Sequence, residues 1–178
     1  VNIGGQVGSN MEAVAQRLVN NEFDSALDLR QDLIESVIEQ NPVITSHTGN
    51  EAPFGYLDWW PNALWMNTLI EPYTDPNIRR AIALTIDRDT VDEIVYQGAK
   101  VSTIFPFPLY PGLQNFVDTP EVQALIEQYD PRKFDLEESA ALMEAAGYAK
   151  NGNDMWEKDG ETVNATIHGF PGIHGDIV

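Results

Sequence analysis

The chain has 178 residues, of which 43% are hydrophobic, and a formal net charge of −18 from 28 acidic and 10 basic side chains. This length and hydrophobic content suit one ordinary domain with a real core and argue against a disordered tail. The negative charge repels phosphate backbones and anionic lipid surfaces, which excludes nucleic acid as an expected partner. The absence of cysteine excludes disulfides, thiolate nucleophiles and cysteine-type zinc sites.

The acidic excess has three interpretations that composition alone does not separate: a solubilising surface, adaptation to a salty or hot medium, or attraction of cationic ligands. No apolar run has the length that a membrane-spanning helix needs. The chain begins with Val and carries no basic-then-apolar signal peptide, so we expect either a mature N-terminus or a fragment of a longer protein.

The first fifty residues alternate between short strands and amphipathic helices. Capping residues at Ser9 and Asp28 predict where the two helices begin. The predicted order is a strand at 1–5, a helix, a strand at 23–27, a helix, and a strand at 43–47. This β-α-β-α-β pattern favours an α/β layer whose strands are joined by helical crossovers.

The best-defined helix of the chain is expected after an aromatic, extended segment at 54–69. Asp75 can cap it by accepting from the free N–H groups of its first turn, and Pro76 suits the first helical position. Four apolar residues then recur at three- and four-residue spacing and predict its buried face: Ile78, Ala81, Ile82 and Ile86.

The remaining elements follow from local capping and turn signals. Asp89 is expected to cap a short helix that ends at Gly98, and residues 101–110 are rich in Pro and extended. A short helix is predicted from Thr119-Pro120 to Tyr129, and another from Asp135 to Gly147. Asp159-Gly160 predicts a two-residue hairpin turn between strands at 155–158 and 162–167.

Three segments together resemble a known protein family. The string from Asn67 to Arg88 is similar to the signature N…P(F/Y)xDxx(I/V)RxA(I/L)xxAIDR, from which only Thr85 departs. Residues 94–99 look like the motif VxxGxA, and residues 129–148 resemble YDPxKAxxLLxEAGY with a longer spacer. These are motifs of the extracellular solute-binding proteins of family 5, the dipeptide/oligopeptide-binding type that serves ABC importers. The resemblance is specific over 52–170 and looser over 1–50.

The resemblance implies a fold and a role. The expected fold is α/β, a lobe of the type II periplasmic-binding-protein kind with a mixed sheet flanked by helices. Residues 1–178 would form a single lobe of a two-lobed protein, with the C-terminal end truncated. The implied function is to capture peptides or similar solutes in the periplasm or outside the cell and deliver them to ABC permease subunits. The full-length protein would be membrane-anchored, and neither catalysis nor a cofactor or metal is expected.

The expected ligand site lies in the aromatic segment, which is similar to a family strand beside the cleft between lobes. The candidates are Tyr56, Asp58, Trp59, Trp60 and Asn67. Adjacent residues of a strand point to opposite faces, so one of Trp59 and Trp60 should be buried and the other should face the cleft. Trp65 is expected in the core, as aromatic strand residues usually are.

Two other functions compete with peptide binding. The Trp residues could stack on sugars, which would make the chain an oligosaccharide-binding protein. Pairs of carboxylates such as Asp87 and Asp89 could serve a hydrolase, but capping and local ion pairing explain their positions better. His168, His174 and Asp176 could converge on a metal, which three residues in a Gly-rich tail support only weakly.

Overall fold

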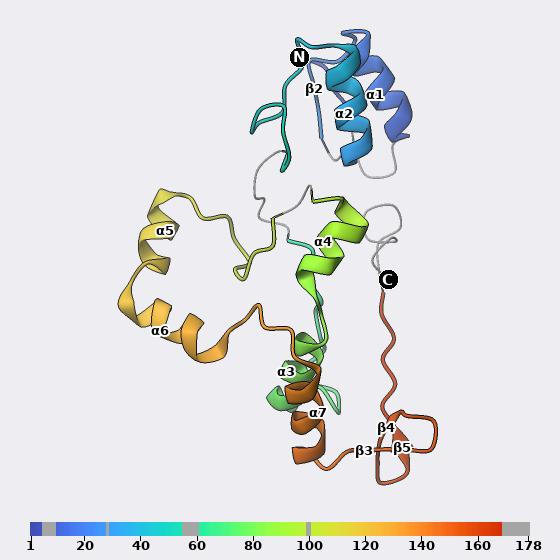
Figure 1. Cartoon of the computed structure of the whole chain (residues 1–178), viewed down its shortest axis with the longest axis vertical. Coiled ribbons are helices and arrows are strands. Elements are labelled where there is room, and N and C mark those ends of the chain that lie inside the picture. The colour runs from blue at the N-terminus through green and yellow to red at the C-terminus, as the bar shows by residue number, and fades with distance from the viewer. Residues whose placement is uncertain (5–9, 28, 55–60, 99–100, 169–178) are drawn as a thin grey trace. The chain divides into compact units, whose positions relative to one another are not determined.

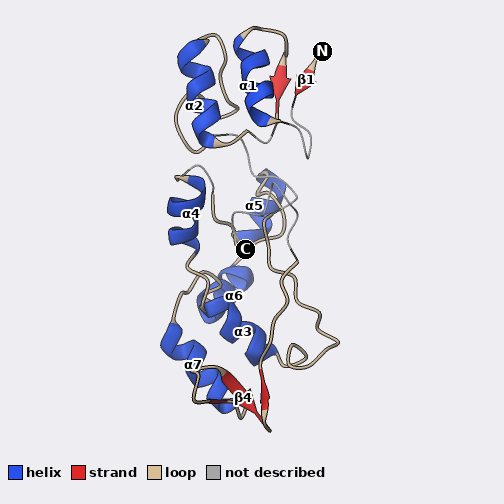
Figure 2. Cartoon of the chain, turned by 90° about the vertical axis from the view of Figure 1, so that its right-hand side faces the viewer, coloured by secondary structure: helices blue, strands red, loops and turns tan. Residues whose placement is uncertain are grey.

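The computed structural model describes residues 1–4, 10–27, 29–54, 61–98 and 101–168, and they divide into two units (Figure 1). Unit 1 comprises Val1–Trp59 and Asp89–Thr103, with the C-terminal residues from Gly169 onward, and unit 2 comprises Trp60–Arg88 and Ile104–His168. Helices account for most of the regular structure and the strands are short (Figure 2). The chain is therefore of mixed helix and strand content, in agreement with the α/β class expected from the sequence.

Unit 1 begins with a strand–helix–strand arrangement. Its elements are β1 (Ile3–Gly4), α1 (Met11–Val19), β2 (Ser25–Ala26) and α2 (Gln31–Gln40). β1 and β2 pair in parallel, with Ile3 opposite Ser25, because α1 returns the chain to the same edge. Asn10 caps α1 through its Oδ1, which accepts from Ala13 N at 2.8 Å. The predicted crossover is thus confirmed, with the cap one residue beyond Ser9.

A small apolar core joins α1 to α2. Ala15, Leu18 and Val37 are buried, and Phe23 is among the half-buried residues that pack against them. Gly4 lies beside this ring: a Cβ at Gly4 would stand 2.6 Å from two carbons of Phe23. Only glycine therefore lets β1 approach this closely.

The third strand predicted in this region is not formed. Residues 43–47 contain only an isolated bridge between Ser46 and Gly49, and Val43 is exposed. Asn41 is the C-cap of α2. Its Nδ2 donates to Val19 O and to Asn21 Oδ1, both at 3.0 Å, and so connects the end of α2 to the end of α1. Alternation alone predicted the strand, but no neighbouring strand pairs with 43–47 among the described residues.

The start of α2 also differs from the prediction. Its N-cap is Arg30, whose side chain makes no capping hydrogen bond, and the predicted cap Asp28 lies outside the described residues.

The last helix of unit 1 is α4 (Arg88–Tyr96), which includes Asp89 in its first turn and has no buried residue. Gly98 follows it with φ +78°, the left-handed conformation predicted for that glycine.

Unit 2 is built on the pairing of α3 (Pro76–Leu84) with α7 (Leu136–Ala145). Ile78, Ala81 and Met143 form its buried core. Two polar contacts fix the pair of helices: Ser139 Oγ donates to Ala81 O at 2.9 Å, and Asp135 N donates to Leu84 O at 3.0 Å. The predicted face of α3 is confirmed at Ile78 and Ala81, whereas Ile82 and Ile86 are half-buried.

A three-stranded antiparallel sheet follows α7. It consists of β3 (Ala149–Lys150), β4 (Trp156–Lys158) and β5 (Glu161–Thr162), paired in the order β3-β4-β5. Asp159 and Gly160 have φ of +54° and +82°, so both central turn residues are left-handed. This is the geometry that a two-residue Asp-Gly hairpin favours. The predicted turn is confirmed, but the second strand ends at Thr162 and does not extend to residue 167 as predicted.

Two helices complete unit 2: α5 (Pro111–Val117) and α6 (Pro120–Tyr129). α6 has the predicted bounds, with Thr119 as N-cap and Pro120 at the first helical position. α5 was not predicted, and neither was β3. In the described part of the chain no helix is long and apolar enough to cross a membrane.

Candidate functional site

The predicted ligand site lies largely outside the part of the chain that the structure describes. Tyr56, Asp58, Trp59 and Trp60 all fall in the undescribed segment 55–60. Asn67 is described and is exposed. Its Oδ1 accepts from Leu69 N at 3.0 Å, and its carbonyl accepts from Ile70 N at 3.3 Å. Asn67 therefore opens a turn, and whether it meets the other four residues stays a prediction.

Trp65 is not a core residue. Its exposed fraction is 78%, which makes the prediction of a buried ring wrong. Residues 61–67 form no helix or strand, so no sheet holds this ring against a second layer. An exposed Trp can offer a flat apolar face to a ligand or to another part of a protein.

Two residues of the family signature, Asp75 and Arg79, form hydrogen bonds at the start of α3. Arg79 Nη1 donates to Tyr73 O at 2.6 Å and to Thr74 O at 3.1 Å. Asp75 caps α3 by accepting from Asn77 N at 2.8 Å. These bonds fix the residues just before α3 to the first turns of that helix, so the signature defines where α3 begins.

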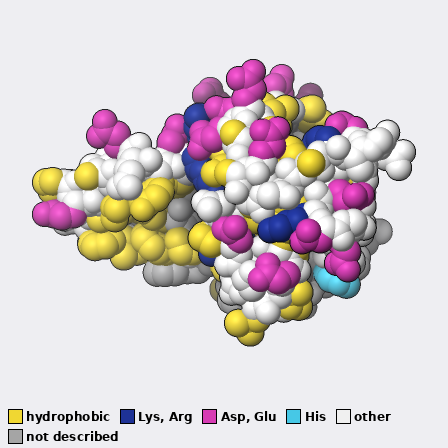
Figure 3. All heavy atoms as spheres, turned by 90° about the horizontal axis from the view of Figure 1, so that it is seen from below, with side chains coloured by type: hydrophobic (Ala, Val, Ile, Leu, Met, Phe, Trp, Pro, Cys, Tyr) yellow, Lys and Arg dark blue, Asp and Glu magenta, His cyan; other side chains and the backbone are white. Residues whose placement is uncertain are grey.

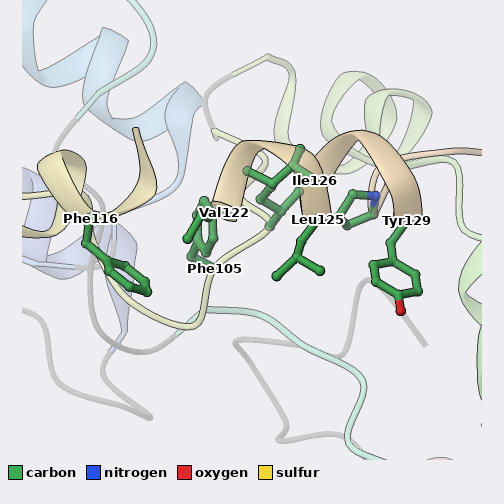
Figure 4. A pocket seen from close by; sticks show the side chains of 8 residues that line it. Phe105, Phe116, Val122, Leu125, Ile126 and Tyr129 are labelled. Carbon is green, nitrogen blue, oxygen red and sulfur yellow. The ribbon is translucent and has the colours of Figure 1, made fainter. Parts of the chain in front are cut away.

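An apolar groove lies beside α5 and α6 (Figure 4). Its volume is about 310 Å³, and its lining contains no charged or amide side chain. The side chains labelled in the figure come from the segment before α5, from α5 and from α6: Phe105, Phe116, Val122, Leu125, Ile126 and Tyr129. We call this set and its neighbours Ile104 and Pro131 the α5–α6 groove.

The sequence carries a signal for this groove in the periodicity of α6. Val122, Leu125, Ile126 and Tyr129 recur at the spacing of one helical face. Phe105 and Phe107 precede α5, and their rings stack with centroids 5.3 Å apart. The stripe predicts an apolar helix face, but only the structure shows that the described residues leave Leu125 and Tyr129 of this face exposed.

Acidic side chains are more widespread than basic ones on the face shown in Figure 3. Several basic side chains are engaged in ion pairs or hydrogen bonds. The ion pairs among the described residues include Arg17–Glu22 at 3.1 Å, Arg30 with Glu12 and Asp32 at 3.2 Å, and Lys150–Asp154 at 3.3 Å. Arg80 donates instead to Asp130 O, and Lys158 to Ala146 O. Exposed pairs of this kind stabilise little, so they leave the repulsion among the remaining carboxylates largely uncompensated.

The stability of the chain is therefore expected to depend on salt. Raising KCl from 0.1 M to 1 M shortens the Debye length from about 10 Å to about 3 Å and screens the repulsion among carboxylates. We expect Tm to rise by about 5 °C or more in a circular dichroism melt. A triple variant, Glu121→Gln, Glu127→Gln and Glu137→Gln, should show a smaller rise because it carries three fewer negative charges. A Tm independent of KCl would contradict this view of the surface.

At the start of α7, the surroundings of Asp135 lower the pKa of its carboxyl group. Asp135 caps the helix by accepting from Glu138 N at 2.8 Å, and Lys133 Nζ lies 2.9 Å from its other oxygen. The Glu138 N–H, followed by Lys133, lowers the pKa of Asp135, because both favour the charged carboxylate. Asp135 therefore stabilises the fold at neutral pH, and this contribution is lost as the pH falls through the lowered pKa.

Asp135→Asn is expected to lower Tm at pH 7 and to have progressively less effect in acid. The asparagine oxygen can still accept from Glu138 N, so the substitution removes the charge and keeps the cap. Melts of both proteins from pH 7 down through the acid range measure the difference directly. A difference in Tm that stays constant across this range would show that the charge of Asp135 is not its cause.

No metal centre is found among the described residues, where no three His, Cys, Asp or Glu side chains are grouped to hold an ion. His168 is described and exposed, whereas His174 and Asp176 lie outside the described residues. The described part of the chain therefore offers the turn at Asn67, the helix caps at Asp75 and Asp135, and the apolar α5–α6 groove.

Comparison with known proteins identifies what the chain is similar to. Residues 6–169 match the model of the bacterial extracellular solute-binding proteins, family 5 Middle. The chain is also 32% identical over 142 residues to Di/tripeptide-binding protein 2 of Pseudomonas aeruginosa (strain UCBPP-PA14). That alignment covers 75% of this chain and 22% of the relative, so the chain spans about a fifth of the relative's length. No solved structure matches it.

Proposed function

The chain belongs to the bacterial extracellular solute-binding proteins of family 5, and we propose that it is one lobe of a two-lobed peptide-binding component of an ABC importer. In this proposal the complete protein captures a peptide outside the cytoplasmic membrane and presents it to the permease subunits. The chain binds its cargo without chemical change. A membrane anchor in the complete protein would keep the binder close to the permease.

The observation that carries the proposal is the family match across 6–169. The relative's name, a di/tripeptide-binding protein, supports a peptide as cargo. The formal net charge of −18 also supports a peptide as cargo, because a negatively charged protein attracts peptides with free amino groups or basic side chains. The type II periplasmic fold and the single-lobe assignment of 1–178 belong to this proposal as well.

The proposed ligand site remains the segment around Tyr56, Asp58, Trp59, Trp60 and Asn67. A peptide offers donors and acceptors along its backbone, which polar groups and ordered water can satisfy generically. Contacts from both lobes would favour the closed form, so the peptide shifts the population toward closure. A single lobe supplies only part of these contacts and should bind weakly.

An oligosaccharide is the competing cargo. The exposed ring of Trp65 favours it, because a solvent-facing indole can stack on a sugar. Both cargoes belong to the same kind of binding protein, so they differ in site chemistry and share the mechanism of closure.

Native mass spectrometry of the complete polypeptide, followed by calorimetry, tests the proposal. We expect a co-purified peptide, and micromolar binding of Ala-Ala or Ala-Lys by the complete protein. The 178-residue chain should bind the same peptides far more weakly. A co-purified sugar, or binding of cellotriose in place of the peptides, would replace peptide by oligosaccharide. Turnover of either compound would contradict the assignment as a binder.

A further inference from the structure

Helix α6 presents an apolar face that the described residues cover only in part: Val122 and Ile126 are half-buried, and Leu125 and Tyr129 are exposed. Val122, Leu125, Ile126 and Tyr129 line one side, and the opposite side carries Ala124 with polar and acidic residues. None of the residues of α6 is buried. A helix of ten residues is marginal in water on its own, and an amphipathic helix is normally stabilised by packing its apolar face.

The apolar face continues beyond α6 into the α5–α6 groove (Figure 4). Phe116, Leu125 and Tyr129 are each more than half exposed. Soluble proteins rarely leave a contiguous apolar patch open to water, and such patches mark sites where another surface docks.

Two hydrogen bonds connect α6 to neighbouring parts of unit 2. Arg80 Nη1 of α3 donates to Asp130 O, just after α6, at 3.2 Å. Gln123 Nε2 donates to Val117 O, at the end of α5, at 2.9 Å. One end of α6 is thereby bonded to α3 and the other to the end of α5.

The apolar lining of the α5–α6 groove favours some occupants over others. A free peptide would bring backbone N–H and C=O groups and charged termini, and among the lining side chains only the Tyr129 hydroxyl could pair with them. An anionic membrane surface is repelled by the net charge of −18. A helix satisfies its own backbone hydrogen bonds, so its apolar side can enter such a groove without leaving polar groups unpaired.

We propose that the α5–α6 groove is an intramolecular docking surface, covered in the complete protein by the apolar face of a helix from outside these 178 residues. The length of the relative supports this source, because the alignment accounts for only 22% of that protein. The inference rests on the proposal that this chain is part of a longer polypeptide, and it does not depend on which solute is bound.

Hydrogen exchange of the wild-type protein gives the first test. The backbone amides of residues 121–129 in α6 should exchange on the order of 100-fold more slowly in the complete polypeptide than in the 178-residue chain. Equal exchange rates in the two proteins would overturn the proposal. This measurement needs neither a substitution nor a ligand, so it stands even if the proposed peptide cargo is wrong.

A matched pair of variants in the complete polypeptide gives the second test. Leu125→Asp places a charge in the groove, and Ala124→Asp places the same charge on the exposed side of the same helix. We expect Leu125→Asp to lower Tm by at least about 5 °C and Ala124→Asp by less than about 2 °C. Equal shifts would overturn the proposal.

Two further outcomes would assign the groove to another occupant and overturn the proposal. If Leu125→Asp kept the wild-type Tm but lost binding of Ala-Phe in calorimetry, the groove would be a solute surface. If light scattering showed the 178-residue chain and the complete protein to be dimers that Leu125→Asp dissociates, the occupant would be a second copy.

Discussion

Replacing Ile78 with Asp is expected to unfold unit 2. Ile78 is 1% exposed and packs with Ala81 and Met143 where α3 meets α7. The substitution removes a buried apolar side chain and leaves an unpaired carboxylate in its place. Together these effects should cost about 4 kcal/mol or more, which is a large part of the stability of an ordinary domain.

The measurement is a circular dichroism melt of the 178-residue chain with a matched control. Ile94→Asp makes the same change on α4 at a residue that is 73% exposed, and it should shift Tm only slightly. Ile82→Asp should fall between the two because Ile82 is half-buried against the same core. A melt of Ile78→Asp that matches the Ile94→Asp melt would show that the α3–α7 interface does not hold the unit together.

Local signals explain why much of unit 2 was predictable from the sequence. Asp75 and Asp135 cap their helices as expected, and Asp159-Gly160 forms the expected turn. Each signal depends on hydrogen bonds or backbone conformations within a few residues, so it needs no knowledge of the rest of the fold.

Features that depend on distant neighbours were not predictable in this way. Residues 43–47 alternate like a strand but lack a strand partner in the described structure, and Trp65 lacks a layer to pack against. Leu84 is fully buried although it was not on the predicted face of α3, because α7 and the segment before it cover the end of that helix. Periodicity shows which residues share a face, and tertiary contacts decide whether that face is covered.

The candidate site was predictable only as a segment. The resemblance led to the residues around Tyr56 and Asn67, while the α5–α6 groove was missed because only Tyr129 and Pro131 of its lining belong to a family motif. Three separate pieces of chain build the groove, and only the fold brings Phe105 and Phe116 into the same lining as Tyr129.

Trp59 and Trp60 are expected to respond to truncation in opposite ways. In the extended segment that the sequence predicts, neighbouring side chains alternate between two faces. We propose that one ring packs in the lobe and that the other faces the solute cleft. Replacing the packed ring by Ala should cost about 3–5 kcal/mol of stability through lost contacts.

The ring that faces the cleft should have the complementary effect. Its truncation should leave Tm nearly unchanged but weaken solute binding by about 2 kcal/mol, as expected for an aromatic anchor. Melts and calorimetric titrations with Ala-Lys on Trp59→Ala and Trp60→Ala in the complete protein separate the two effects. Trp65→Ala is the control, because its exposed ring should contribute little to stability. If Trp59→Ala and Trp60→Ala both melted and bound like the wild type, neither ring would belong to the core or the site. The solute-binding surface would then have to be sought elsewhere in the protein.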